Sequence, residues 1–262
     1  MIHVTPSRKP STNDGDANWH KIRTLRVDDA DQTSVEPPRM PWTAPRLVLV
    51  HIVDLTRPIV AGMQVYPGDP EPRATIVSTI ADDEFELHRL DLGSQTGTHM
   101  DAPSHTLVGG GASESVALTR LVGRGVVVDV TDADDLVEGL IGPGPWLDSV
   151  GPGDLVLFRA DWDRFDREDR AWEHPGLTVE LAADLVAREV ALVGLDFASV
   201  DRHAADLATH RVLAAAGIPV IENMTHLAEV DWPDPLIVIL PMSWPGLDGA
   251  PVRAIACDLT RD

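Results

Sequence analysis

Short, almost wholly apolar segments constrain the fold of this chain more than any other feature. They occur at Val126–Val130, Leu155–Phe158, Val190–Asp196 and Ile218–Glu222. A strand without a regular row of polar side chains suits a sheet that is covered on both faces. The pattern therefore predicts a central sheet whose two sides are both packed against other parts of the chain.

The other predicted elements mix strands with a few helices. Thr178 is a suitable N-cap for a helix that extends to Glu189, and a second helix is expected around His203–Ala216, ending at Gly217. Further strands are expected at Leu47–Leu55, at Phe85–Leu92 with Gly93–His99 as its continuation, at Leu236–Leu240 and at Val252–Cys257. The class is α/β or α+β, with a central mixed sheet or partial barrel.

Residues 1–45 differ in composition from the remainder of the chain. They are polar, contain several prolines and offer little apolar periodicity, so we expect an N-terminal extension followed by one domain over residues 46–262. Trp19 and Trp42 could still dock on the domain or on a second subunit, because exposed tryptophan is uncommon without a partner.

Charge and composition exclude several classes of function. Lys and Arg number 21 against 42 Asp and Glu, which gives a formal net charge of −21. A chain this acidic repels phosphate backbones and anionic lipid, so we expect no nucleic-acid or membrane partner. Neither a signal-peptide pattern nor a disulfide pair is present, since Cys257 is the single cysteine. We therefore expect a cytoplasmic protein.

The segment Ser94–His105 carries most of the chemistry. If it is extended, Gln95, Gly97, His99 and Asp101 share one face, because side chains alternate along a strand. An imidazole and a carboxylate that point to one spot suit zinc or manganese. Pro103 redirects the chain, so that His105 can return toward the same place; a solvated polar turn is the alternative interpretation.

A second pair of candidate ligands lies downstream. His210 falls on a predicted helix, and Glu222 ends the strand that follows it. The residues around Glu222 are apolar on both sides, and a carboxylate in such a setting needs a cation or hydrogen-bond donors. Both side chains can face one edge of the sheet.

These segments resemble a known family. The stretch Gln95-Thr-Gly-Thr-His-Met-Asp-Ala-Pro-Ser-His105 is similar to the motif His-x-Gly-Thr-His-x-Asp-x-Pro-x-His of the cyclase family of metal-dependent hydrolases, which includes bacterial kynurenine formamidase and isatin hydrolase. It departs from that motif only at Gln95, where the family has histidine. Further similar segments are Asp54–Thr56, Tyr66–Asp69, His174–Leu177, Gly194–Asp201, Gly217–Asn223 and Leu240–Arg253.

The resemblance implies a swivelling β/β/α-type fold that assembles as a homodimer or homotetramer. It also implies metal ligation at His99, Asp101, His210, Glu222 and the Gln95 position, proton transfer at His105 and substrate contact at Tyr66. Asp101 and Glu222 would bridge to a second ion held by His210. One or two Zn²⁺ or Mn²⁺ ions are expected per subunit, and the amide oxygen of Gln95 favours the harder Mn²⁺.

The function implied is hydrolysis of a carbon–nitrogen bond in a small aromatic substrate, an amide, N-formyl amine or lactam, as by an arylformamidase of tryptophan catabolism. Two alternatives stay open: a catalytically silent relative that binds a small molecule, and a polyketide-type cyclase or dehydratase.

Cys257 is expected to be a buried apolar residue. Asp161–Glu173 is expected to be a solvated loop with its aromatic residues tucked beneath it, with a substrate lid as the alternative, and His174 could line the pocket.

Overall fold

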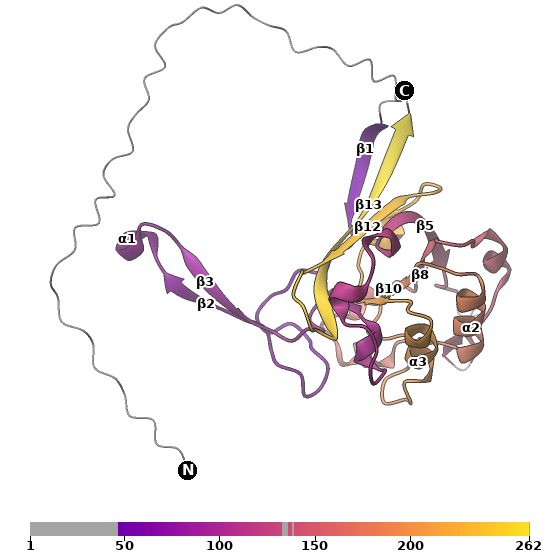
Figure 1. The fold of residues 1–262 in the computed structure, drawn as a ribbon, viewed down its shortest axis with the longest axis horizontal. Helices are drawn as coiled ribbons and strands as arrows, with labels where there is room; N and C mark the ends of the chain where they lie inside the picture. Colours follow the sequence, from indigo (N-terminus) through magenta and orange to yellow (C-terminus); the bar gives the residue numbers. More distant parts are fainter. Residues whose placement is uncertain (1–46, 133–135, 138, 262) are drawn as a thin grey trace, which may run out of the picture. The chain divides into compact units, whose positions relative to one another are not determined.

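The computed structural model describes residues 47–132, 136, 137 and 139–261 (Figure 1). The predicted extension over residues 1–45, with Trp19 and Trp42, lies outside the described residues. None of the helices in the described ranges is long and apolar enough to cross a bilayer.

A sheet of eight strands forms the centre of the fold. Its strands are β1 Leu47–Asp54, β4 His99–Asp101, β5 Val122–Asp129, β8 Leu155–Arg159, β10 Leu192–Leu195, β11 Val220–Glu222, β12 Leu236–Pro241 and β13 Gly249–Arg261. The order is β1-β13-β12-β5-β8-β10-β11-β4, and β4 also pairs with β13. That last pairing closes seven strands into a barrel-like ring and leaves β1 outside it.

Both directions of pairing occur in this ring. Strands β5, β8, β10 and β11 run parallel, and the remaining pairings are antiparallel. This confirms the predicted class, an α/β fold with a mixed sheet or partial barrel.

Two α-helices lie beside the parallel strands. Helix α2 spans Val179–Ala187 and begins at Thr178, whose hydroxyl accepts the amide hydrogen of Leu181, as predicted. Helix α3 spans Ala208–Ala215 and is shorter than predicted. The carboxylate of Asp201 explains its start, because it accepts from the backbone nitrogens of Thr209 and His210 and so satisfies the first turn.

The described residues also contain smaller elements. Strands β2 Arg73–Ser78 and β3 Leu87–Asp91 form a two-stranded ribbon with the short helix α1 Ile80–Asp83 at its tip, and β6 Leu136–Val137, β7 Leu140–Ile141 and β9 Gly176–Leu177 form a third sheet. The 3₁₀-helices are Pro103–His105, Ser113–Ser115, Leu118–Arg120, Pro145–Ser149, Trp162–Phe165, Asp169–Glu173 and Leu227–Glu229.

One strand prediction is wrong. Gly93–His99 does not continue β3, because residues 94–98 turn before β4 begins at His99. Gly97 has a φ of +67°, a backbone conformation that suits glycine, and a Cβ built there would lie 3.0 Å from Ile59 Cγ1. Only His99–Asp101 is therefore extended.

The core has two parts, one on each side of β8. Val156 and Phe158 pack with Leu181 and Leu185 of α2, whereas Leu155 packs inside the ring with residues such as Met100. Each of these side chains is completely buried, which stabilises the fold by about 1.5–3 kcal/mol per large residue. The four consecutive apolar residues Leu155–Phe158 of β8 are thus explained by a strand covered on both faces, and Cys257 is buried as expected.

Candidate metal centre

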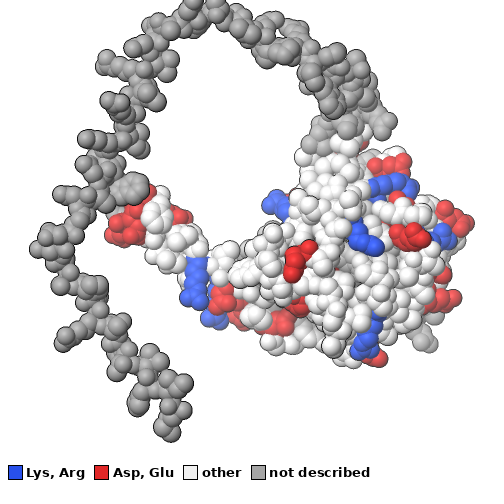
Figure 2. Space-filling view, viewed as in Figure 1, with Lys and Arg blue, Asp and Glu red and all other residues white. Residues whose placement is uncertain are grey.

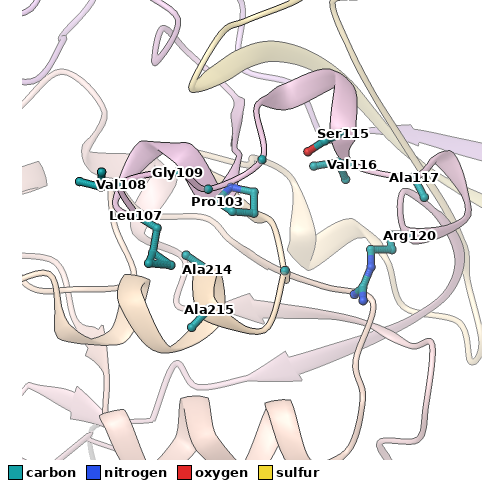
Figure 3. Close-up of a pocket in the computed structure, with 13 residues that line it drawn as sticks. Pro103, Leu107, Val108, Gly109, Ser115, Val116, Ala117, Arg120, Ala214 and Ala215 are labelled. Atoms are coloured by element: carbon teal, nitrogen blue, oxygen red, sulfur yellow. The ribbon is translucent and has the colours of Figure 1, made fainter.

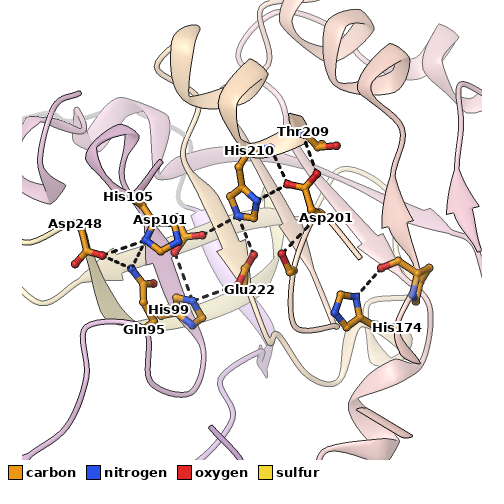
Figure 4. Close-up of polar contacts among 12 residues, drawn as sticks. Gln95, His99, Asp101, His105, His174, Asp201, Thr209, His210, Glu222 and Asp248 are labelled. Atoms are coloured by element: carbon orange, nitrogen blue, oxygen red, sulfur yellow. Dashed lines mark hydrogen bonds and ion pairs between the residues drawn. The ribbon is translucent and has the colours of Figure 1, made fainter. Parts of the chain in front are cut away.

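Four ionisable side chains meet at one end of the parallel strands (Figure 4). His99 and Asp101 lie on β4, Glu222 ends β11, and His210 lies on α3. The antiparallel register of β4 and β11 places Glu222 opposite His99. All four side chains are buried, with exposures between 4% and 6%.

Each carboxylate in this cluster lies between the two imidazoles. His99 Nε2 is 3.5 Å from Asp101 Oδ1 and 3.4 Å from Glu222 Oε2. His210 Nε2 is 3.2 Å from Asp101 Oδ2 and 3.3 Å from Glu222 Oε1. Each imidazole therefore faces one oxygen of Asp101 and one of Glu222, and no oxygen is shared between the two histidines.

The remaining ring nitrogens fix how the imidazoles are turned. His99 Nδ1 lies 2.8 Å from the carbonyl oxygen of Gly97, and His210 Nδ1 lies 2.7 Å from Asp201 Oδ2. Because Nδ1 of each ring donates to one of these oxygens, Nε2 is the nitrogen that faces the carboxylates of Asp101 and Glu222. Histidine ligands of metal ions are commonly held in this way.

Strong electrostatic coupling accompanies this geometry. Burial alone lowers the pKa of His99, but Glu222 and Asp101 outweigh it and raise that pKa to about 9. Burial would raise the pKa of Glu222, but His210 and His99 hold it at about 2. The pKa of His210 is likewise raised, because Asp101, Asp201 and Glu222 outweigh its burial. Two buried carboxylates thus require positive charge beside them.

The donor set fits a divalent metal ion. Asp101 Oδ1 and Glu222 Oε1 are buried and accept no hydrogen bond from the described residues. Ligand atoms of His99, Asp101 and Glu222 all lie within 4.8 Å of one another. Imidazole nitrogen and carboxylate oxygen are the ligands expected for zinc or manganese.

Beside this cluster of four side chains lies a second polar group, formed by Gln95, His105 and Asp248 (Figure 4). Asp248 Oδ2 is 3.0 Å from Gln95 Nε2 and 3.1 Å from His105 Nδ1, and Gln95 Nε2 is 3.1 Å from that same ring nitrogen. Ser94 Oγ donates to the other oxygen of Asp248. The amide nitrogen of Gln95 is thereby fixed, whereas its buried oxygen has no hydrogen-bond partner among the described residues.

The two groups share a cavity of about 610 Å³. Its lining includes Gln95, His99, His105, His210, Glu222 and Asp248, together with Tyr66 and Trp172. The Tyr66 ring lies 5.6 Å from Trp172 and 5.5 Å from His203 between centroids. Tyr66 is half exposed, so Tyr66 and Trp172 form an aromatic wall at the edge of the cavity.

A second cavity, of about 580 Å³, lies on the other side of the Pro103 turn (Figure 3). The loop Gly109–Gly111 lines it together with Ala214 and Ala215. Arg120 is the one ionisable side chain among its lining residues, and its guanidinium donates to the carbonyl oxygens of Val190 and Ala191. This cavity therefore offers no group for acid–base chemistry.

The chain is similar to known proteins. Residues 53–202, more than half of the chain, match the Cyclase family model. The chain belongs to the Cyclase family. Within it, the chain is 33% identical over 215 residues to a kynurenine formamidase of Salinibacter ruber, covering 79% of this chain and 97% of the relative. It is 31% identical over 220 residues to a kynurenine formamidase of Paracidovorax citrulli, covering 81% and 97%.

Solved structures of the Cyclase family share the fold. One described as a potential metal-dependent hydrolase with cyclase activity has a TM-score of 0.67 and 29% identity, over 81% of this chain and 98% of its own. Isatin hydrolase A from Ralstonia solanacearum has a TM-score of 0.68 and 21% identity, over 79% and 91%, and shows the fold alone.

In this member of the Cyclase family, the predicted residues come together. His99, Asp101, His210 and Glu222 form one cluster, and Gln95, His105 and Tyr66 line the same cavity. Their roles as ligands, proton carrier and substrate contact stay predictions.

Sequence analysis gave no role to Asp201 or Asp248. Asp201 lies only nine residues before His210. A search of the sequence for carboxylates near the predicted ligands could therefore have found it. Asp248 is 143 positions from His105, and no local pattern points to it.

Two expectations about nearby residues need revision. Trp162 and Phe165 pack on each other, 5.1 Å between centroids, as expected for a loop with tucked aromatic residues. Trp172 of the same loop instead reaches the cavity. His174 does not line this cavity; it is buried, stacks on Phe197 and has Nδ1 2.7 Å from the carbonyl oxygen of Pro175.

Proposed function

We propose that the chain is a metal-dependent hydrolase that cleaves the carbon–nitrogen bond of a small aromatic amide, N-formyl amine or lactam. The observation that carries this proposal is a buried His–Asp–His–Glu cluster beside His105 in a cavity with an aromatic wall. Relatives named kynurenine formamidase support the reaction type.

His99, Asp101 and Glu222, whose ligand atoms lie within 4.8 Å of one another, would hold the metal together with His210. Gln95 would contribute its buried amide oxygen. A bound divalent ion supplies Lewis acidity, which polarises a carbonyl and acidifies water. The two histidines face different oxygens of the two carboxylates, so the donors divide into a His99 set and a His210 set. We propose one or two Zn²⁺ or Mn²⁺ ions, the carboxylates bridging the two sets.

Gln95 makes the two donor sets unequal. An amide oxygen is a weaker ligand for zinc than imidazole and suits a harder ion. We therefore expect purified protein to hold its second ion more weakly than its first. Titration of the metal-free protein by calorimetry tests this, and Gln95→His is expected to tighten the weaker step; two equal steps in both proteins would contradict it.

His105 would carry the proton. Its Nδ1 lies beside Asp248, which favours the tautomer with hydrogen on Nδ1 and leaves Nε2 to accept a proton and return it to the departing nitrogen. The carboxylate also stabilises the imidazolium that forms when the proton is taken. Asp248 is then a positioning residue that acts through His105.

The aromatic wall would hold the ring of the substrate. Tyr66 and Trp172 meet edge to face, so a third ring can lie against them with the reacting bond directed toward the cluster. Both residues line the cavity together with His105 and Glu222. An aliphatic formamide would lose this contact while keeping the reacting group.

The test is an assay of metal-stripped and metal-restored protein on N-formyl aromatic amines, isatin-like lactams and an N-formyl alkylamine. Metal-dependent turnover of the aromatic substrates is expected, with His105→Ala inactive and His88→Ala, an exposed histidine outside the cavity, unaffected. If no divalent ion supports cleavage of any carbon–nitrogen bond, the proposal is wrong. Protein without stoichiometric metal would point instead to a catalytically silent relative.

A further inference from the structure

The cavity of about 580 Å³ beside the Pro103 turn takes no part in the proposed hydrolysis and is here called the second cavity. Its volume lies within the range of roughly 300–1,000 Å³ that is typical of ligand pockets. Gly109 and Gly217 both line it, and a Cβ built at either position would meet no atom within 4 Å beyond its chain neighbours. The space beside these two glycines is therefore open to a ligand.

Most side chains that line the second cavity are apolar. Figure 3 shows Leu107, Ala214 and Ala215 on one side of it and Arg120 on the opposite side. No aspartate or glutamate of the described residues is among those that line it. Such walls favour a ligand with an apolar body, because its surface leaves water on binding. The apolar lining residues include Pro103, Leu107, Val108, Val116, Ala214 and Ala215.

Arg120 supplies the charge of the second cavity. A guanidinium carries five N–H donors on its three nitrogens. Nη1 of Arg120 donates to the carbonyl oxygens of Val190 and Ala191, at 3.4 and 3.2 Å, and these bonds hold the side chain in place. Nε and Nη2 donate to no atom of the described residues. An arginine edge with two free nitrogens can bind a carboxylate through two parallel hydrogen bonds.

Arg120 differs in this respect from other arginines of this acidic chain. The formal net charge is −21, and Figure 2 shows acidic side chains in several groups on the face in view. Arg124, Arg159 and Arg253 each bond to an aspartate. In the described ranges Arg120 bonds to backbone carbonyl oxygens alone, so no carboxylate bonded to it neutralises its charge. Its positive field therefore remains available to a bound anion.

We propose that the second cavity binds a small organic acid, a monocarboxylate with an apolar body. The carboxylate pairs with Nε and Nη2 of Arg120, and the apolar body lies against Leu107, Ala214 and Ala215. Inorganic phosphate would leave the apolar walls uncovered, and a neutral apolar molecule would leave the arginine edge without an acceptor. An apolar carboxylate uses both features.

The second cavity lies behind two elements of the metal centre. Pro103 begins the turn that contains His105, and Ala214 and Ala215 end helix α3, which carries His210. A Cβ built at Gly110 would lie 2.6 Å from the carbonyl carbon of Pro103, so residues 109–111 pack directly on this turn. A ligand here touches these elements without entering the cavity that the two histidines line. Its binding is therefore distinguishable from binding to a metal ion.

Calorimetric titration of the full chain with phenylacetate tests the proposal. A binding step that persists unchanged after removal of divalent ions is expected, because the lining residues of the second cavity include none of the candidate metal ligands. 2-Phenylethanol, which lacks the charge, and inorganic phosphate, which lacks the apolar body, should each bind roughly tenfold or more weakly. Equally tight binding of either compound would show that the assigned ligand class is wrong.

Two variants change the second cavity in different ways. Arg120→Gln removes the charge, whereas Ala215→Leu fills the space and leaves Arg120 in place; each should weaken the metal-independent step roughly tenfold or more. Arg188→Gln is the control for charge, since Nη1 of Arg188 also donates to a backbone carbonyl oxygen but lies outside the cavity. Ala183→Leu, at an exposed position of helix α2, is the control for size. Both controls should bind phenylacetate as the wild type does.

Absence of the metal-independent step in the wild type, or its persistence in either cavity variant, would overturn the proposal. Circular dichroism checks that each variant folds. Should Arg120→Gln fail to fold, Ala215→Leu still tests the place of binding, and 2-phenylethanol still tests the need for a carboxylate. The titrations measure binding and not turnover, so their outcome is independent of the proposed hydrolase activity.

Discussion

Asp248→Asn tests whether a carboxylate positions His105. The substitution keeps the size and shape of the side chain but removes the charge that faces His105 Nδ1 at 3.1 Å and Gln95 Nε2 at 3.0 Å. Burial opposes ionisation of Asp248, but His105, Ser94 and Gln95 outweigh it and lower its pKa to about 2, so the group is charged throughout the assay range.

The expected loss follows from one hydrogen bond to a charged group. Such a bond is worth about 1.5–3 kcal/mol, and the 43% exposure of the Asp248 side chain places it at the lower end of that range because solvent screens it. A loss of about 1.5 kcal/mol lowers kcat roughly tenfold. Because Asp248 acts through His105, we expect kcat to fall with little change in KM.

The assay measures kcat and KM for an N-formyl aromatic amine, with metal content determined on the same samples. Asp69→Asn is the matched control, since it removes the same charge from the lining of the same cavity, and neither its activity nor its metal content should change. Asp248→Glu should recover part of kcat. Unchanged kcat in Asp248→Asn at full metal content would refute the positioning role, as would an equal loss in the Asp69 variant.

Three further predictions concern stability, metal and substrate. Burial raises the pKa of Asp196 to about 7, so the folded state holds a proton that the unfolded state releases near pH 4, and stability falls as pH rises between these values. Urea denaturation should therefore give Asp196→Asn a free energy of unfolding up to about 4 kcal/mol higher than that of the wild type at pH 8. Below pH 4 the two proteins should not differ. Removal of divalent ions with a chelator should lower the Tm of the wild type, measured by calorimetry, but not the Tm of the double variant His99→Ala/His210→Ala. Trp172→Ala should raise KM for aromatic formamides roughly two- to tenfold and leave KM for an N-formyl alkylamine unchanged.

The elements that could be predicted from sequence are those whose residue pattern follows from burial. Leu155–Phe158 is apolar throughout because β8 is covered on both faces, and Thr178 precedes α2 because its hydroxyl satisfies the first turn. Strand β2 was not predicted, since its residues face solvent and carry no burial pattern. Period-two alternation failed across Gly97, where a left-handed backbone angle ends the extended conformation.

The sequence could predict the side chains that form the candidate site, but not the residues that orient them. His99 and Asp101 share a strand, and Glu222 ends its neighbour, so local pattern and strand pairing bring them together. Asp248 reaches His105 only because residues 247–249 run alongside residues 101 and 102, with the backbone nitrogen of Ala102 donating to the carbonyl oxygen of Asp248. That contact depends on how β13 closes the ring against β4, which is a property of the whole fold.

Gln95 contacts both Asp248 and His105. Its amide nitrogen donates to Asp248 Oδ2 at 3.0 Å and lies 3.1 Å from His105 Nδ1, the ring nitrogen that also faces Asp248. Its amide oxygen is buried and accepts no hydrogen bond from the part of the chain that the structure describes. A role of Gln95 in metal binding would therefore be coupled to the orientation of His105, and we expect Gln95→His to change both.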